Sequence, residues 1–200
     1  MMGKTHVAMG MATSMLVFHP TTPELCLVAL AGGAVGGVVA DVDTVTNDYK
    51  YDALIGQLIA YGTLLICLGI DFLNNYGICD SLMKRNMMIN VLGIIIYLML
   101  ICGGVESNHR TFTHSLFALC LYSTAVCIVL PQIVGAFIVG YLSHLVLDIT
   151  NKKPVPLFYP KGKGICLKLF YAGKVADKIF MVIGIVITLT LVVNVFMPIG

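Results

Sequence analysis

The sequence predicts an all-α protein, a polytopic transmembrane helical bundle of about seven helices. Of its 200 residues, 58% are apolar and only 11% are charged, whereas a soluble domain has roughly 25% charged residues. The apolar residues are gathered in long runs without the two-residue alternation of membrane strands. Because lipid offers the backbone no hydrogen-bond partner, such runs must form helices.

Seven apolar segments separated by polar breaks are the expected helices: residues 7–18, 25–40, 53–73, 87–104, 114–130, 131–148 and 179–197. His19-Pro20 ends the first, Asp41 stops the second, and Pro131 divides the fifth from the sixth. A helix needs ~20 residues to cross the bilayer. The third, fourth and seventh segments meet this length, whereas the first two are short and are expected to be tilted, interfacial or sheltered by neighbouring helices.

The second segment has two pairs of glycines four residues apart, Gly32 with Gly36 and Gly33 with Gly37. Small residues at this spacing let two membrane helices approach closely, so packing is their expected role. The length of the chain predicts a single integral-membrane domain over residues 1–200.

The basic residues predict the orientation. If all seven segments cross the membrane, the N-terminus and loops 41–52, 105–113 and 148–178 share one side, and ten of the twelve Lys and Arg residues lie there. The positive-inside rule places that side in the cytoplasm and the C-terminus outside. We therefore expect a multi-pass protein of the inner membrane. A net charge of +2 is too small for nucleic-acid binding.

The rare polar residues near the helix ends fall on this same side. Seven of them are candidate metal ligands: His6, Asp41, Asp43, His109, His114, His144 and Asp148. His144 and Asp148 are four residues apart, on one face of a helix. Ionisable residues at membrane depth are costly and mark functional sites. The sequence therefore predicts a shared metal site on the cytoplasmic face.

Imidazole and carboxylate ligands suit zinc, with manganese or iron as alternatives. Seven candidates exceed the four ligands of one zinc, so we expect either more than one ion, up to three, or one ion with outer partners. A two-metal site can activate water and hold a phosphoester. Arg110 is the expected holder of a phosphate oxygen, and Asp41 or Asp43 is expected to bridge ions or act as general base.

Several motifs give the chain a resemblance to a known family. They are Lys4-Thr5-His6, Ala40-Asp41-Val42-Asp43, His109-Arg110-Thr111-Phe112-Thr113-His114-Ser115-Leu116, Gly140-Tyr141-Leu142-Ser143-His144-Leu145-Val146-Leu147-Asp148 and Pro156-Leu157-Phe158-Tyr159-Pro160. Over residues 4 to about 160, the chain resembles the YdjM-like family of membrane-bound metal-dependent hydrolases. The resemblance implies a bacterial or archaeal inner-membrane protein.

The motif order is also similar, more distantly, to that of zinc-dependent phospholipase C and P1-type nucleases. This likeness implies a metal-ligand role for six residues: His6, Asp41, His109, His114, His144 and Asp148. Asp43 is then a ligand or an outer base. Ala40 stands where the family commonly has the proline of Pro-Asp-x-Asp, and the chain has no Trp to match the amino-terminal ligand of the secreted enzymes.

The favoured function is hydrolysis of a phosphoester in an anionic, lipid-like or amphiphilic substrate. Loop 148–178 holds seven lysines, which either fix the orientation against anionic headgroups or recruit such a substrate. The main alternative is a divalent metal transporter or a metal-sensing membrane protein without catalysis. A third hypothesis is a structural or regulatory membrane protein.

Overall fold

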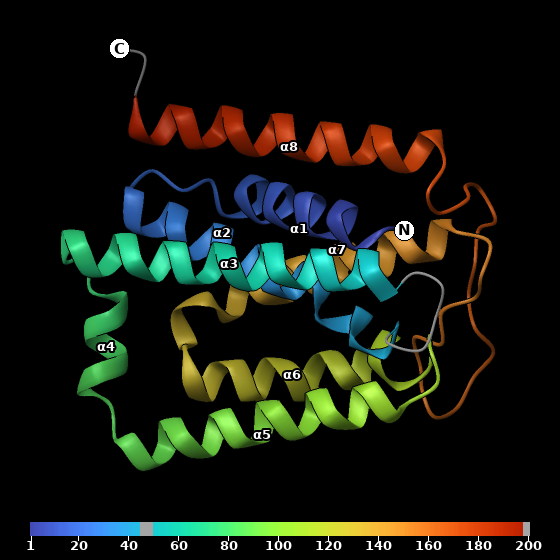
Figure 1. The fold of residues 1–200 in the computed structure, drawn as a ribbon, viewed down its shortest axis with the longest axis horizontal. Helices are drawn as coiled ribbons and strands as arrows, with labels where there is room; N and C mark the ends of the chain where they lie inside the picture. The colour runs from blue at the N-terminus through green and yellow to red at the C-terminus, as the bar shows by residue number, and fades with distance from the viewer. Residues whose placement is uncertain (45–49, 198–200) are drawn as a thin grey trace.

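The structure is a computed structural model that describes residues 1–44 and 50–197. Eight α-helices and three short 3-10 helices form the regular structure of these residues (Figure 1). The α-helices are α1 (Gly3–Phe18), α2 (Pro23–Val38), α3 (Lys50–Asn74), α4 (Ile78–Lys84), α5 (Met87–Glu106), α6 (Leu116–Val129), α7 (Val134–Thr150) and α8 (Val175–Phe196). The 3-10 helices are η1 (Val39–Thr44), η2 (Phe112–His114) and η3 (Pro131–Ile133). The predicted all-α bundle is confirmed.

The seven predicted segments correspond to every α-helix except α4, a short additional helix between α3 and α5. Asp71, which is buried near the end of α3, fixes the start of α4. Its Oδ1 accepts the N–H of Ile78 at 3.0 Å, and its Oδ2 accepts the N–H of Cys79 at 2.7 Å. No helix was predicted here because the segment has only seven residues and its start depends on the side chain of Asp71.

Among the described residues, five helical stretches are long and apolar enough to cross a membrane: Pro23–Thr44, Lys50–Asn74, Met87–Glu106, Pro131–Thr150 and Val175–Phe196. The second predicted segment is thus long enough to cross the membrane, because the 3-10 helix η1 continues directly from the end of α2. Helices α1 and α6 are shorter, with 16 and 14 residues. Helix α1 packs against α2, α3, α7 and α8, so this short helix is sheltered by its neighbours.

Helix α2 lies at the centre of the bundle, and its glycines bring the neighbouring backbones close. A Cβ on Gly37 would lie 2.5 Å from the carbonyl oxygen of His6 in α1, and a Cβ on Gly36 would lie 2.1 Å from that of Phe137 in α7. Real Cβ atoms do not approach so closely, so both positions require glycine. The predicted packing role of these glycines is confirmed, and it determines how closely α1 and α7 approach α2.

The outer helices α3, α5 and α8 turn large apolar side chains away from the protein. Leu65 of α3 is 69% exposed and Met99 of α5 is also 69% exposed. In a soluble protein such surfaces would drive association, whereas in a bilayer they contact hydrocarbon. The exposed faces of these helices are therefore the lipid-facing surface.

The polar ends of several helices gather at one end of the bundle. Figure 1 shows the N-terminus, the start of α3, the end of α5, the end of α7 and the start of α8 at the same end, on the right of the view. The segment between α7 and α8 also lies there, held by single β-bridges that join Asn151 to Phe170 and Val155 to Ile165. This arrangement confirms that the chain elements carrying the candidate ligands meet at one end.

Candidate metal centre

All seven predicted ligand residues lie in three overlapping groups at this end of the bundle. In each group, one potential ligand atom of every residue lies within 4.8 Å of the others. The groups are His6 with His144 and Asp148, Asp41 with His114 and His144, and Asp43 with His109 and His114. Six of the seven residues are buried, and His109 is partly buried. Since His114 and His144 each belong to two groups, the groups form one continuous cluster.

His144 presents one ring nitrogen to the cluster because the other is already bonded. Its Nδ1 lies 2.8 Å from the carbonyl oxygen of Gly37, a contact that places the ring hydrogen on Nδ1. The free Nε2 then lies 3.3 Å from Nε2 of His114. Histidine ligands of metals are usually oriented in this way by a hydrogen bond through their second nitrogen.

His6 fits a metal ligand for a different reason. Its side chain is fully buried, yet neither ring nitrogen has a hydrogen-bond partner among the described residues. Its Nε2 lies 3.4 Å from Oδ1 of Asp148, and its ring stacks on that of His144 with 3.7 Å between centroids. Buried polar atoms normally have partners, so the orphaned imidazole indicates that a ligand belongs at this position.

Asp43 orients the ligands around it. Its Oδ1 lies 2.8 Å from Nδ1 of His109, and its Oδ2 accepts the N–H of Arg110 at 2.9 Å and the hydroxyl of Thr113 at 2.6 Å. Nδ1 of His114 lies 3.3 Å from the same Oδ2. Thr113 is itself fixed through its carbonyl oxygen, which accepts the hydroxyl of Tyr141. These contacts fit an outer carboxylate that orients two imidazoles better than a direct ligand.

His114 occupies the middle of the cluster, in η2. Its Nε2 lies 3.4 Å from Oδ2 of Asp148 and 3.8 Å from Oδ1 of Asp41. Burial lowers the pKa of this imidazole, but hydrogen bonds to Asp148 and Asp43 outweigh burial and raise the pKa to about 9. Without a metal, a proton therefore balances the carboxylates, and a divalent cation binding at the same nitrogen would displace it.

Asp148 contacts a guanidinium and the nitrogen of the first residue as well as the imidazoles of the cluster. Nη2 of Arg110 lies 2.7 Å from its Oδ2, and the nitrogen of Met1 lies 2.5 Å from its Oδ1. Arg110 also donates through Nη1 to the carbonyl oxygen of Lys153 at 2.9 Å, while its Nε is buried without a partner among the described residues. The predicted anion holder is thus anchored to a candidate ligand, and its Nε–H has no partner among the described residues.

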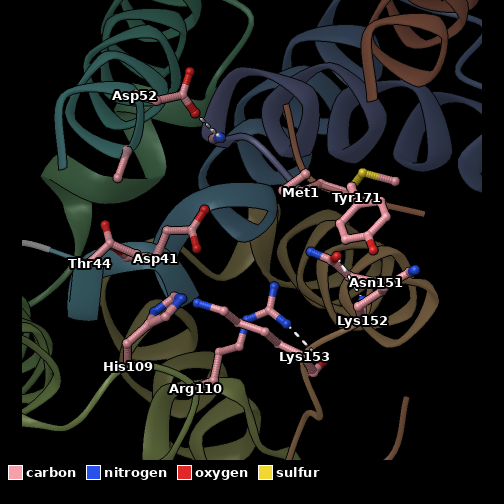
Figure 2. A pocket seen from close by; sticks show the side chains of 13 residues that line it. Met1, Asp41, Thr44, Asp52, His109, Arg110, Asn151, Lys152, Lys153 and Tyr171 are labelled. Atoms are coloured by element: carbon pink, nitrogen blue, oxygen red, sulfur yellow. Dashed lines mark hydrogen bonds between the residues drawn. The ribbon is translucent and has the colours of Figure 1, made fainter. Parts of the chain in front are cut away.

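A pocket of about 250 Å³ gives access to the cluster from the end of the bundle. Figure 2 shows Asp41 and His109 on one side of this pocket, Asn151, Lys152 and Tyr171 on the other, and Arg110 between them. Lys152 stacks its ammonium 3.9 Å from the centre of the Tyr171 ring. The rim is therefore basic, while the floor carries carboxylate and imidazole groups.

Two buried carboxylates that the sequence analysis missed hold the start of α1. Asp52 accepts the N–H of Gly3 through Oδ2 at 2.5 Å. Asp177 accepts the N–H of Met2 through Oδ1 at 3.3 Å and that of Gly173 through Oδ2 at 2.7 Å. They fix the turn that precedes His6. The available sequence signal was a single acidic residue at the start of an apolar segment, Asp52 before 53–73 and Asp177 before 179–197, but neither lies in a ligand motif.

The fold and the cluster define a class of protein: a polytopic helical membrane protein with a buried His/Asp centre, able to hold metal, at one end of the bundle. Within this class, residues 1–198 match the YdjM inner membrane protein family, and the chain belongs to that family. The match confirms the resemblance to the YdjM family inferred from the motifs and extends it beyond residue 160. The more distant likeness to phospholipase C and P1-type nucleases stays a prediction. No curated protein and no solved structure matches the chain.

Proposed function

We propose that this protein is a metal-dependent hydrolase of the inner membrane that cleaves a phosphoester of a lipid or amphiphilic substrate at a site facing the cytoplasm. The observation that supports this most directly is the overlap of three buried His/Asp groups through His114 and His144. A single structural ion would need only one such group. An extended cluster beneath an accessible pocket is typical of a site that holds ions and substrate together.

The donor set fits zinc, with manganese or iron as alternatives, in one to three positions. Nitrogen ligands would come from His6, His109, His114 and His144, and oxygen ligands from Asp41 and Asp148. When bound, a divalent ion supplies Lewis-acid polarisation and lowers the pKa of water. Asp43 keeps His109 and His114 oriented and is the nearest group able to accept a proton from either ring.

Arg110 is the proposed anion holder. Its guanidinium lies in the pocket wall beside the cluster, and its unpartnered Nε can donate to a phosphate oxygen. Lys152 and Lys153 line the same pocket, so a negatively charged substrate is attracted to its rim. The location of this rim at the end of a membrane bundle favours a substrate with an anionic head and an apolar tail.

The test is an activity assay on detergent-purified protein whose metal content has been measured by elemental analysis. Phosphatidic acid and p-nitrophenyl phosphate are supplied with zinc or manganese. We expect turnover in the wild type and its loss in His144→Ala, together with a reduced metal content. His19→Ala is the matched control, because His19 follows the other end of α1 and lies outside the cluster.

Metal bound in stoichiometric amounts without turnover of any phosphoester would contradict the hydrolase proposal. Uptake of zinc or manganese into vesicles that contain the protein would then favour the transporter alternative. Equal metal content and activity in His144→Ala and wild type would contradict a role of the cluster in hydrolysis and in metal transport.

A further inference from the structure

A second cavity, of about 210 Å³, lies among the membrane helices away from the metal centre. Its lining is apolar and comes from α2, α3, α4, α5, α6 and η3. Tyr61 of α3 and Tyr97 of α5 line it with their rings, and their hydroxyls are hydrogen-bonded to each other at 2.9 Å. The two tyrosines therefore present hydrocarbon to the cavity.

Water is a poor occupant of this cavity, because a buried water needs two to four polar partners. An empty cavity is also unfavourable, since a void in a packed protein costs on the order of 24 cal/mol per Å³. The helices that form the walls, α3 and α5, carry highly exposed apolar side chains such as Leu58 and Leu98. At this depth of a membrane the surrounding molecules are lipids, so the occupant consistent with the walls is an acyl chain.

The cavity and the pocket of the metal centre lie along the same helix. Asp52 and Ala53 of α3 line the pocket, whereas Tyr61, Leu64 and Leu68 line the apolar cavity. A rise of ~1.5 Å per residue puts Leu64 about 16 Å beyond Ala53. One leaflet contributes about half of the ~30 Å hydrocarbon core, so this separation matches the reach of one lipid tail.

A third cavity, of about 180 Å³, adjoins the pocket of the metal centre at the start of α3. The two share Thr44 and Ala53, and the third cavity is also lined by Lys50, Tyr51, Leu54 and Gln57. Gln57, Tyr61, Leu64 and Leu68 follow at spacings of four, three and four residues, which places them on one flank of the helix. This side of α3 runs from the basic rim of the metal-centre pocket toward the interior of the bilayer.

We propose that the apolar cavity between α3 and α5 binds an acyl chain of the lipid whose anionic head group occupies the pocket of the metal centre. The assignment of the head group rests on the proposed function, whereas the assignment of the tail rests on the apolar cavity. Together, the two assignments narrow the substrate class to phosphorylated lipids with at least one long acyl chain.

The tail assignment is tested by photolabelling, which needs no turnover. The full-length protein is placed in vesicles of phosphatidylethanolamine and phosphatidylglycerol that contain phosphatidic acid with a diazirine near the end of one chain. Mass spectrometry then locates the label. We expect labelling of Tyr61, Leu64 and Tyr97, and a loss of at least fivefold at Tyr61 and Tyr97 in Leu64→Trp, because the indole fills the cavity.

The matched control is Leu65→Trp, the same change one residue further on, where the side chain is 69% exposed toward lipid. It should leave the label at Tyr61 and Tyr97 unchanged. Leu98→Trp fills the cavity from α5 and replaces Leu64→Trp if that variant does not fold. Labelling that is equal in the wild type and in a folded cavity-filling variant overturns the tail assignment.

Measurements of hydrolysis distinguish a failure of the tail assignment from a failure of the proposed hydrolase function. If both hold, Leu64→Trp raises the KM for dioleoyl phosphatidic acid at least fivefold and leaves p-nitrophenyl phosphate hydrolysis unchanged. Hydrolysis of both compounds that does not respond to Leu64→Trp overturns the tail proposal alone. Cavity labelling without any hydrolysis supports the lipid site and contradicts the hydrolase. Absence of label at Tyr61 and Tyr97 in the wild type, with the lipid labelling only the exposed faces of α3 and α5, would also overturn the proposal.

Discussion

The rings of His6 in α1 and His144 in α7 stack with 3.7 Å between their centroids and 22° between their planes. Both depend on Gly37 of α2, which touches the backbone of His6 and accepts a hydrogen bond from Nδ1 of His144. Helices α1, α2 and α7 therefore meet at Gly37. How closely they pack there determines the distance between the candidate ligands His6 and His144.

Gly37→Ala should separate these ligands. Its Cβ would lie 2.5 Å from the carbonyl oxygen of His6, so α1 must shift, at a cost of about 1–3 kcal/mol. Thermal unfolding in detergent and elemental analysis should show lower stability and less bound metal. Gly62→Ala is the control, because nothing lies within 4 Å of a Cβ there. Equal stability and metal content in the two variants would contradict the role of Gly37.

Asp43→Asn tests whether Asp43 orients ligands or binds metal itself. The amide keeps the shape of the side chain but loses the charge that holds His109 and His114. Loss of an outer carboxylate weakens metal affinity by about 10–100-fold, with the number of ions unchanged. Competition with a chelator measures the affinity, and Asp80→Asn on α4 is the control. Loss of a whole ion from Asp43→Asn would instead make Asp43 a ligand.

Asp177→Ala should loosen the start of α1. The change leaves the N–H groups of Met2 and Gly173 without their acceptor. Because Met2 is only partly buried and Gly173 is exposed, the cost should be less than the ~1–3 kcal/mol of a fully buried donor. Metal affinity should fall with stability because His6 lies in the next turn. Asp177→Asn should recover part of both, since the amide retains one acceptor oxygen. Thermal unfolding and chelator competition measure these effects.

Glu106→Ala is the control for Asp177→Ala, because Glu106 is exposed at the same end of the bundle. Full stability and metal affinity in Asp177→Ala would show that Asp177 does not position α1.

The predicted orientation has a direct test in cells. Alkaline phosphatase fused after residue 200 should be active, and a green fluorescent protein at the same point should be dark, because seven crossings put the C-terminus outside. A fluorescent fusion would place the C-terminus in the cytoplasm and the His/Asp cluster outside. That result would contradict the proposed cytoplasmic substrate pocket.

Much of the bundle was predictable because membrane helices are encoded locally. Runs of apolar residues indicated every described α-helix except α4, and counting crossings put His6, His114 and His144 at one end. The Gly32 to Gly37 stretch indicated a face for helix packing, but not which helices pack against it. Helix α4 was missed because its start depends on Asp71, a cap provided by the preceding helix.

The members of the His/Asp cluster and the end of the bundle that holds it follow from the amino-acid sequence, because the length and number of the apolar segments constrain where polar residues lie. The pairing of atoms within the cluster follows from the packed helices: Asp43 contacts two imidazoles, Asp177 and Asp52 hold the start of α1, and Arg110 binds Asp148. These contacts join residues far apart in the chain, and their geometry depends on how closely the helix backbones pack, which no local pattern records.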